Sequence, residues 1–317
     1  MRAAAQVRLL NVGWGDAHLI RLPSGAVTLI DGGDGAAGPD RDHPLSWMDR
    51  EGVRRLDWMI LTHIHEDHLN GLLDVARRRE VRRAVLPYEL PPPPFGAWPD
   101  TAGGLPPGAA RVLRMLAAYE DLVRLLQEQG TDIRWRSGYG AAGREILWEE
   151  EGCALAHVYP WADDPLPGLA ALREAAREDG RPFEARLASL ESFFSLSNDD
   201  SSVYRLASAD DPAGAVLFGG DQVAAGWTRL LGRADLQCGV WKVPHHGLED
   251  AFRADILSAI GPRHCVVPIC IDRSRPLRPH WERVLASSDA ALHLTGERAT
   301  GDPVRLTDGP IEVWVGG

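Results

Sequence analysis

The sequence has few cysteines, no long apolar segment and almost no lysine. Its cysteines, Cys153, Cys238, Cys265 and Cys270, form no CxxC pair, and a chain of this length does not need disulfides to hold a core together. We therefore expect reduced, mostly buried thiols and a cytoplasmic protein. No stretch approaches the roughly 18 apolar residues of a transmembrane helix. The first residues also lack the apolar core of a secretory signal. These absences predict a protein without a membrane segment.

Basic residues are scarce relative to acidic ones. The 317 residues include 34 lysines and arginines against 45 aspartates and glutamates, which gives a net charge of −11. Lys242 is the only lysine. An acidic chain is not expected to coat nucleic acid, because coating requires a basic face. A small site can still bind a phosphodiester through metal ions and a few arginines.

Apolar strands alternate with helical segments along much of the chain. Short aliphatic runs separated by glycine-rich turns predict strands in the first and last thirds. This alternation predicts an α/β architecture. Two segments interrupt it: residues 88–130 combine a Pro-rich loop with an amphipathic helix, and residues 165–195 form a second helical stretch broken near Gly180. We interpret both as insertions within a single domain of residues 1–317.

One six-residue motif, HIHEDH, follows an apolar strand and opens onto a helix. His63 and His65 are two apart in an extended segment and can face the same way, while Asp67 and His68 lie at the start of the helix. Imidazoles and carboxylates at this density are typical ligands of Zn²⁺, Mn²⁺ or Fe. The motif therefore indicates a metal site.

Two later strands end in residues of the same kind. The run AVLFGGD ends in Asp221, and GVWKVPHHG contains His245 and His246. Ligands at the C-terminal ends of strands are usual on α/β scaffolds. We expect Asp221 and one of the two histidines to join the HIHEDH motif, with the other histidine supporting the ligands. Since these residues span positions 63–246, they must meet within one domain.

HIHEDH, the strand ending in GGD and the VPHHG segment together resemble the metallo-β-lactamase-fold hydrolases. The segments LLNVGWGDAHLIRL, LIDGGDG, NDDSSVYRL and RPLRPHWERVL fall in the order of one branch, the hydrolase domain of the ComEC-type DNA-uptake channel and its free-standing soluble relatives. The resemblance covers almost all of the chain except its Pro-rich and helical middle. It implies an αββα sandwich with a dinuclear metal site along one edge of the two sheets.

The resemblance also implies a role for each motif residue. Two metal ions would share six ligands: His63 and His65 on the first, Asp67 and His68 on the second, Asp221 between them, and His245 completing the second. Asp31, in LIDGG, would support the ligands without binding metal, and so would His246.

The first metal lacks one ligand of the family pattern. Many relatives supply a third histidine ahead of the GGD strand, where this chain reads SNDDSS. Asn198, Asp199, Asp200 or water would take that place, and His157 is an alternative from an earlier strand. An oxygen-rich first site favours Mn²⁺, whereas imidazoles suit Zn²⁺, so two divalent ions of either kind are expected.

The implied reaction is hydrolysis by a hydroxide that bridges the two metals and is oriented by Asp67. His280 matches a family position and is a candidate to donate a proton to the leaving group. Among the basic residues near the motifs, Lys242 and Arg278 are expected to bind a phosphate.

Three functions fit this pattern. The first is a phosphodiesterase or nuclease acting on DNA, RNA or a small phosphodiester, with single-stranded nucleic acid as one candidate partner. The second is hydrolysis of a small carbonyl substrate such as a lactone, thioester or β-lactam. The third is a metal-binding scaffold with little turnover, in which residues 88–130 or 165–195 would contact a protein partner.

Overall fold

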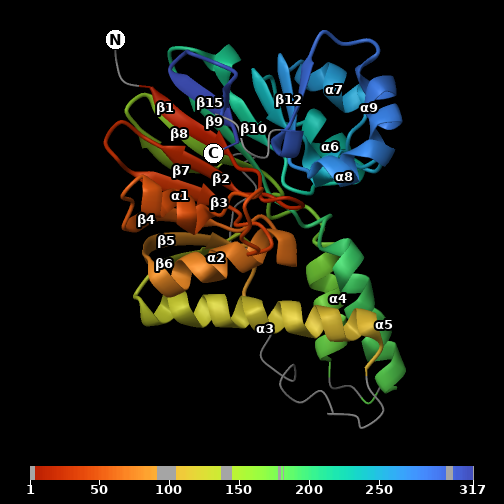
Figure 1. The fold of residues 1–317 in the computed structure, drawn as a ribbon. Coiled ribbons are helices and arrows are strands. Elements are labelled where there is room, and N and C mark those ends of the chain that lie inside the picture. The colour runs from red at the N-terminus through yellow and green to blue at the C-terminus, as the bar shows by residue number, and fades with distance from the viewer. Residues whose placement is uncertain are drawn as a thin grey trace.

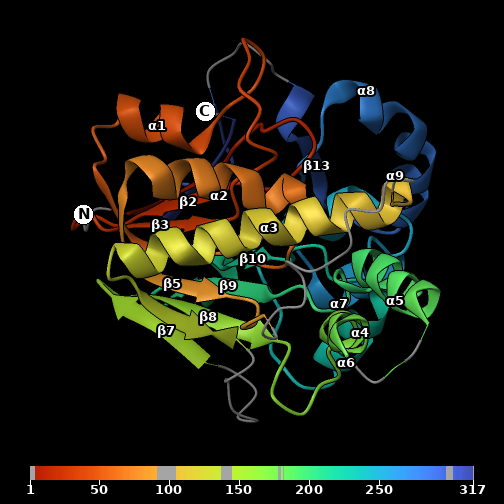
Figure 2. The same ribbon diagram turned by 90° about the horizontal axis from the view of Figure 1, so that it is seen from below.

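Two β-sheets pack face to face, and helices cover the outer face of each (Figures 1 and 2). This computed structural model describes residues 4–90, 105–136, 145–177, 180, 182–297 and 303–316. The layering confirms the predicted αββα sandwich.

Within the described residues, the first sheet has eight strands and the second has seven. The first sheet has the order β14 (Val304–Arg305), β15 (Ile311–Val315), β1 (Ala5–Leu9), β2 (His18–Arg21), β3 (Val27–Ile30), β4 (Arg55–Ile60), β5 (Glu80–Leu86) and β6 (Asp132–Trp135). The second has the order β13 (Ala291–Leu294), β12 (His264–Val267), β11 (Val240–Lys242), β10 (Val216–Phe218), β9 (Val203–Ser208), β8 (Cys153–Tyr159) and β7 (Glu145–Glu150).

Alternating apolar residues explain why the sheets pack. In β1, Ala5, Val7 and Leu9 are buried, while Gln6 and Arg8 between them are half-buried. Because residues two apart share a face of a strand, the three buried side chains point the same way. They join side chains of β8 to β12 in one apolar cluster between the sheets. Removing this apolar surface from water is the main force that holds the sandwich together.

Two further apolar clusters attach the helices to the outer faces. The first sheet is covered by α1 (Pro44–Arg50), α2 (Glu66–Arg78) and α3 (Pro107–Glu128), with α4 (Pro167–Ala176) and α5 (Phe183–Leu196) beside them. The second sheet is covered by α6 (Ala224–Leu231), α7 (Ala254–Ile260) and α9 (Arg278–Leu285), and α8 (Ile271–Ser274) precedes α9. None of the helices in the described part of the chain is long and apolar enough to cross a membrane.

The segments interpreted as insertions join the helical layer of the first sheet. Helix α3 connects β5 to β6, which pair in parallel and therefore need a crossover between them. Helices α4 and α5 pack on each other, and α5 packs on α3 (Figure 2). Residues 91–104, which include the Pro-rich run, lie outside the described residues. The division into one domain with two insertions stays a prediction.

Parallel strands bring the motifs to one edge of the sandwich. Strands β3 to β6 run parallel in the first sheet, and β10 to β13 run parallel in the second. The HIHEDH loop follows β4, and the GGD and PHHG segments follow β10 and β11. Polar side chains from both sheets therefore meet at the same edge.

Candidate metal centre

The HIHEDH loop is positioned by a carboxylate from the neighbouring strand. Asp31, directly after β3, accepts hydrogen bonds from the amide and the hydroxyl of Thr62, both at 2.8 Å. The same carboxylate lies 2.8 Å from Nδ1 of His68. Asp31 thus fixes the ring of His68 and leaves its Nε2 free to face the other motif residues.

Helix α2 approaches the backbone after β3 unusually closely. The amide of Gly32 donates to the carbonyl of His68 at 2.7 Å. A Cβ atom on Gly71 would lie 1.8 Å from the carbonyl oxygen of Gly32, so a larger residue would push the helix away. The first turn of α2 carries Asp67 and His68, and this close packing holds both beside the sheet edge.

A first group of ligand atoms combines His63, His65 and Asp221, and these atoms all lie within 4.8 Å of one another. Nε2 of His63 is 3.9 Å from Oδ2 of Asp221. Nε2 of His65 is occupied, because it lies 2.7 Å from both the carbonyl of Phe194 and the hydroxyl of Ser197. Nδ1 is therefore the atom that His65 can offer to a metal.

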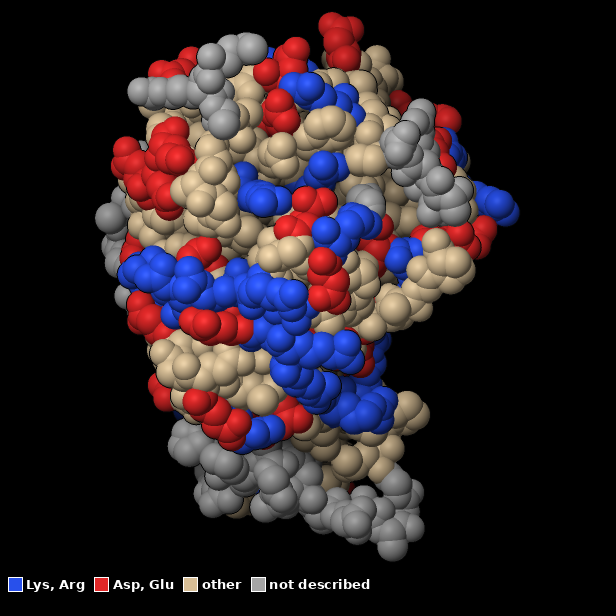
Figure 3. Space-filling view, turned by 60° about the vertical axis from the view of Figure 1, so that its left-hand side comes forward, with Lys and Arg blue, Asp and Glu red and all other residues tan. Residues whose placement is uncertain are grey.

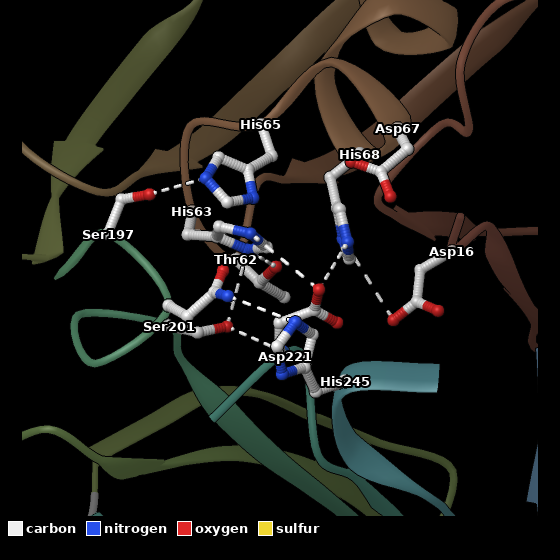
Figure 4. A network of polar contacts seen from close by, with 12 residues as sticks. Asp16, Thr62, His63, His65, Asp67, His68, Ser197, Ser201, Asp221 and His245 are labelled. Carbon is white, nitrogen blue, oxygen red and sulfur yellow. Dashed lines mark hydrogen bonds and ion pairs between the residues drawn. The ribbon is translucent and has the colours of Figure 1, made fainter. Parts of the chain in front are cut away.

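A second group combines Asp67, His68 and His246. Nε2 of His246 lies 3.4 Å from a carboxylate oxygen of Asp67 and 3.4 Å from Oδ2 of Asp221. Oδ2 of Asp221 is also 3.3 Å from Nε2 of His68. Figure 4 shows this carboxylate between the imidazoles of the two groups. Asp221 therefore belongs to one group and reaches the other.

The chemistry of these atoms fits divalent metal ions. Nε2 of His63, His68 and His246 and Oδ1 of Asp221 are buried and have no hydrogen-bond partner among the described residues. Buried polar atoms in proteins are normally satisfied, so several unpartnered atoms close together fit a cation site. Neutral imidazole nitrogens and carboxylate oxygens are ligands of Zn²⁺ and Mn²⁺.

Burial and the clustered charges shift the pKa values in this centre. Burial lowers the pKa of His63 well below its usual value, and the nearby imidazoles add to that effect. Burial also acts to lower the pKa of His246, but Asp221 and Asp67 outweigh it and raise that pKa to about 10. For Asp67, burial acts to raise the pKa, and the imidazole of His246, 3.4 Å away, lowers it to about 2. Without metal, the carboxylates are thus ionised and attract protons to the facing imidazoles.

A cavity of about 480 Å³ opens over the two groups. It is lined by Asp67, Asp221, His65 and His246 from the groups, and by Asn198, His245, Asp34, Glu66, Cys270, the aromatic residues Trp14 and Phe194, and the arginines Arg41, Arg111 and Arg273. The guanidinium of Arg273 lies 4.4 Å from the ring centre of Trp14, and that of Arg111 lies 4.3 Å from the ring centre of Phe194. The cavity therefore joins a candidate metal centre to cationic and aromatic walls.

Residues 11–137 match the model of the metallo-beta-lactamase superfamily. The match includes the HIHEDH loop, while Asp221 and His246 lie beyond it. The two sheets and their flanking helices give the chain the metallo-β-lactamase fold. No curated protein sequence matches the chain.

Three solved structures illustrate what the chain is similar to. A diphosphatase of the PhnP family is 15% identical, with 92% of this chain and 84% of that chain covered and a TM-score of 0.41. The metallo-β-lactamase-fold protein YhfI from Bacillus subtilis is 9% identical, with 91% and 95% covered and a TM-score of 0.45. CmlA, a diiron β-hydroxylase from Streptomyces venezuelae, is 13% identical, with 93% and 53% covered and a TM-score of 0.45. The chain thus spans about half the length of CmlA.

On this metallo-β-lactamase fold, the PHHG segment presents His246 and not His245 to the ligand groups. Both residues have positive φ angles, 46° and 50°, so the backbone turns sharply and separates their rings by 6.3 Å. His246 is fully buried against Asp221. His245 is the histidine that was predicted as a ligand. Its Nδ1 lies 2.9 Å from Oδ1 of Asp250, and its Nε2 lies 3.1 Å from the side-chain nitrogen of Asn198. It lines the cavity and belongs to neither group.

Of the candidates for the missing ligand, only Asn198 lines the cavity. The carboxylate of Asp200 turns away and accepts hydrogen bonds from the amides of Gly168 and Leu169 at the start of α4. Asp199 is not among the cavity residues, and burial raises its pKa. His157 is buried on β8, with its ring 5.4 Å from the ring of Tyr204. The carboxamide oxygen of Asn198 is buried without a hydrogen-bond partner among the described residues, which fits a ligand position.

The three other predicted side chains lie outside the cavity lining. Lys242 is fully buried and forms an ion pair with Asp16. Arg278 lies on α9 and pairs with Glu297 at 3.6 Å. Nε2 of His280 lies 2.8 Å from the carbonyl of Phe252. The structure therefore does not bring Lys242, Arg278 or His280 to the cavity, and it places Arg41, Arg111 and Arg273 there.

Asp16 is the residue of the centre that the sequence pattern did not single out. It is fully buried, with its carboxylate beside Lys242 and 3.8 Å from Nδ1 of His246. Burial acts to raise the pKa of Asp16, but Lys242 holds it below its usual value. The available signal was the aspartate that stands between a glycine and an apolar run in GWGDAHLI. A charged residue beside such a run is rarely buried unless a partner of opposite charge is present.

Proposed function

We propose that this protein is a metal-dependent hydrolase whose dinuclear centre cleaves phosphodiesters. The observation that carries the proposal is the pair of ligand groups joined by Asp221 under a cavity with arginines in its walls. The arginines favour a substrate that carries negative charge beside the bond to be cleaved. The resemblance of the motifs to the ComEC-type hydrolase domain supports a phosphodiester substrate and a cytoplasmic enzyme.

Each of the two groups of residues would hold one divalent ion, either Zn²⁺ or Mn²⁺. His63, His65 and Asp221 would hold the first, and Asp67, His68 and His246 the second, with Asp221 between them. When bound, two such ions activate a water molecule as nucleophile and stabilise the charge that develops on the substrate oxygens.

The protein's own residues orient the reacting groups. Asp67 lines the cavity and remains ionised because the pKa of its carboxyl lies near 2, so it can accept a hydrogen bond from an attacking water. Asp31 keeps His68 in a single orientation. His245 lines the cavity with Nδ1 held by Asp250 and Nε2 accepting from the side-chain amide of Asn198, so it positions Asn198 beside the ligand groups.

Arginine and aromatic side chains support binding of a phosphodiester. The guanidinium fork binds phosphate oxygens in pairs, which a lysine cannot do. Arg41 and Arg111 also pair with the acidic residues Asp34 and Glu66, whereas Arg273 has no carboxylate partner among the described residues. Arg273 is therefore the arginine of the cavity most available to a phosphate. The rings of Trp14 and Phe194 lie against the guanidinium groups of Arg273 and Arg111, so they hold these two arginines in the cavity wall.

A substrate screen with metal analysis tests this function. The protein is loaded with Zn²⁺ or Mn²⁺ and offered bis-p-nitrophenyl phosphate, labelled single-stranded DNA, a lactone and a thioester. We expect turnover of a phosphodiester by the wild type and by His293→Ala, a half-buried histidine on β13 that serves as the matched control. Asp221→Ala and His63→Ala should lose both activity and metal.

Two results would contradict the proposal. Turnover of only the lactone or the thioester would assign the centre to carbonyl substrates. If the wild type binds metal that His63→Ala loses, yet turns over none of the four substrates, the chain is a metal-binding scaffold and not a hydrolase.

A further inference from the structure

Arginines gather at the end of the first sheet that lies away from the metal centre. Strand β4 begins at Arg55 and leads to the HIHEDH loop, and α2 begins in that loop and ends at Arg78. The opposite end of these elements carries what we call the arginine band: Arg50, Arg54, Arg55, Arg77, Arg78, Arg82, Arg83 and Arg134. Figure 3 shows arginines as a continuous strip across one face of the molecule.

Contacts between neighbouring strands join arginines of the band in two sets. A carboxylate oxygen of Asp57 lies 3.7 Å from Arg55 on β4 and 3.4 Å from Arg82 on β5. The guanidinium groups of Arg83 on β5 and Arg134 on β6 both lie 5.2 Å from the ring centre of Trp58. The strand register therefore gathers arginines that are up to 79 positions apart in the sequence.

Arg79 ties the end of α2 to α1 through an ion pair with Asp49. This contact places Arg77 and Arg78 beside the exposed Arg50 at the end of α1. The band thus continues from the sheet onto the two covering helices.

The band has more cationic groups than its carboxylates neutralise. Arg55, Arg77 and Arg82 have side chains 47–51% exposed, and their acidic contacts are Asp57 and Asp74, of which Asp57 serves two arginines. Arg54 and Arg78 are exposed and have no carboxylate partner among the described residues. Such a surface attracts a polyanion even though the whole chain carries a net charge of −11.

We propose that the arginine band binds the sugar–phosphate backbone of a single-stranded nucleic acid. Every cation of the band is a guanidinium, the side chain suited to paired contacts with phosphate oxygens. The ring of Trp58 is 4% exposed and is already contacted by two arginines, so the band contacts the backbone and does not stack bases. Binding is therefore independent of base sequence.

The surroundings of the band favour nucleic acid over a lipid surface. A membrane-binding face normally adds exposed apolar side chains to its basic residues. The large hydrophobic residues that are exposed in the described part of the chain are Ile146 and Ile271, and neither belongs to the band. Helix α2, with 13 residues, separates the band from the metal centre by about 20 Å.

Binding by the band does not depend on the proposed hydrolysis, so it is tested without metal. Fluorescence anisotropy follows a labelled single-stranded DNA of about 20 nucleotides in chelator, over a series of salt concentrations. The variant Arg54→Gln/Arg78→Gln/Arg82→Gln removes three charges of the band. The matched control, Arg173→Gln/Arg253→Gln/Arg283→Gln, removes three exposed arginines on α4, before α7 and on α9.

The band variant should bind the DNA at least about 10-fold more weakly than the wild type near 50 mM salt. The slope of log K against log salt should also be smaller in magnitude by about 2, because each of the three lost phosphate contacts removes about 0.7 from it. The control should stay within about 2-fold of the wild type. Circular dichroism checks that both variants are folded.

Four results would overturn the proposal: no binding by the wild type, equal weakening in both variants, tighter binding of an acidic peptide, or tighter binding of anionic phosphatidylserine vesicles. Turnover of bis-p-nitrophenyl phosphate is measured on the same samples. It should be equal in the band variant and the wild type, because this small substrate does not reach the band. A protein that binds DNA through the band and hydrolyses nothing would refute the proposed function and leave this inference intact.

Discussion

Replacing Lys242 with methionine should destabilise the protein strongly, although lysine is usually a surface residue. The side chain of Lys242 is 0% exposed. Its Nζ donates to the carbonyl of Gly220 at 2.8 Å, pairs with Asp16 and lies 3.8 Å from Oδ1 of Asp221. Methionine has a similar length and fills the same space, so the substitution removes the charge and little of the packing.

The size of the effect follows from what is left behind. Asp16 is fully buried, and Lys242 is the cation that holds its pKa below the usual value. Breaking a buried ion pair by removing one partner costs about 3–5 kcal/mol, because the other charge remains in a poorly solvated place. A domain is stable by about 5–15 kcal/mol, so the variant should be near the limit of folding.

Urea unfolding in the presence of chelator measures this loss without a contribution from bound metal. The double variant Lys242→Met/Asp16→Asn no longer buries an unpaired charge, and it should recover at least about half of the lost free energy of unfolding. A loss below about 1 kcal/mol in Lys242→Met, or a double variant less stable than the single one, would refute the assignment of Lys242 as a buried ion-pair partner.

Three further predictions concern ligands and protons. Elemental analysis should find one metal ion per chain in His246→Ala and two in His245→Ala, because only His246 belongs to a ligand group. An equal loss of metal in the two variants would contradict this assignment. Metal loading of the apoprotein near pH 7 should release protons, since the carboxylates raise the pKa of His246 to about 10 and metal binds the neutral imidazole; calorimetric heats that do not depend on the buffer would contradict it. Burial raises the pKa of Asp200 to about 7, above the value of about 4 expected in the unfolded chain, so stability should fall as the pH rises through that range. In thermal unfolding, Asp200→Asn should reduce the change of stability with pH. If stability changes with pH as much as in the wild type, other groups cause the change.

The sequence pattern was sufficient to predict that the polar side chains following β4 and β10 lie close together, because each follows the end of an apolar strand. It was not sufficient to choose between His245 and His246. These residues are adjacent in a turn with positive φ angles, where strand alternation no longer tells which ring points inward. Asp16 was not predicted for a different reason: its partner Lys242 lies in the other sheet, and only the packing of the two sheets brings them together.

The arginine band shows why net charge is a poor guide to a surface. The repeated arginines after positions 53, 76 and 81 are visible in the sequence, yet they belong to a strand start, a helix end and a second strand. An acidic chain can still carry such a local basic surface, because parallel strands place their N-terminal ends along one edge.

The same parallel strands explain how the fold separates two electrostatic environments. Their C-terminal ends carry the carboxylates and imidazoles of the metal centre, where a cation is needed. The N-terminal ends of β4 and β5 carry the arginine band, where an anion is attracted. Without metal, the carboxylates of the centre would repel a polyanion held by the band. Bound metal ions would reverse the local charge and add a second attraction at the other end of the same helix.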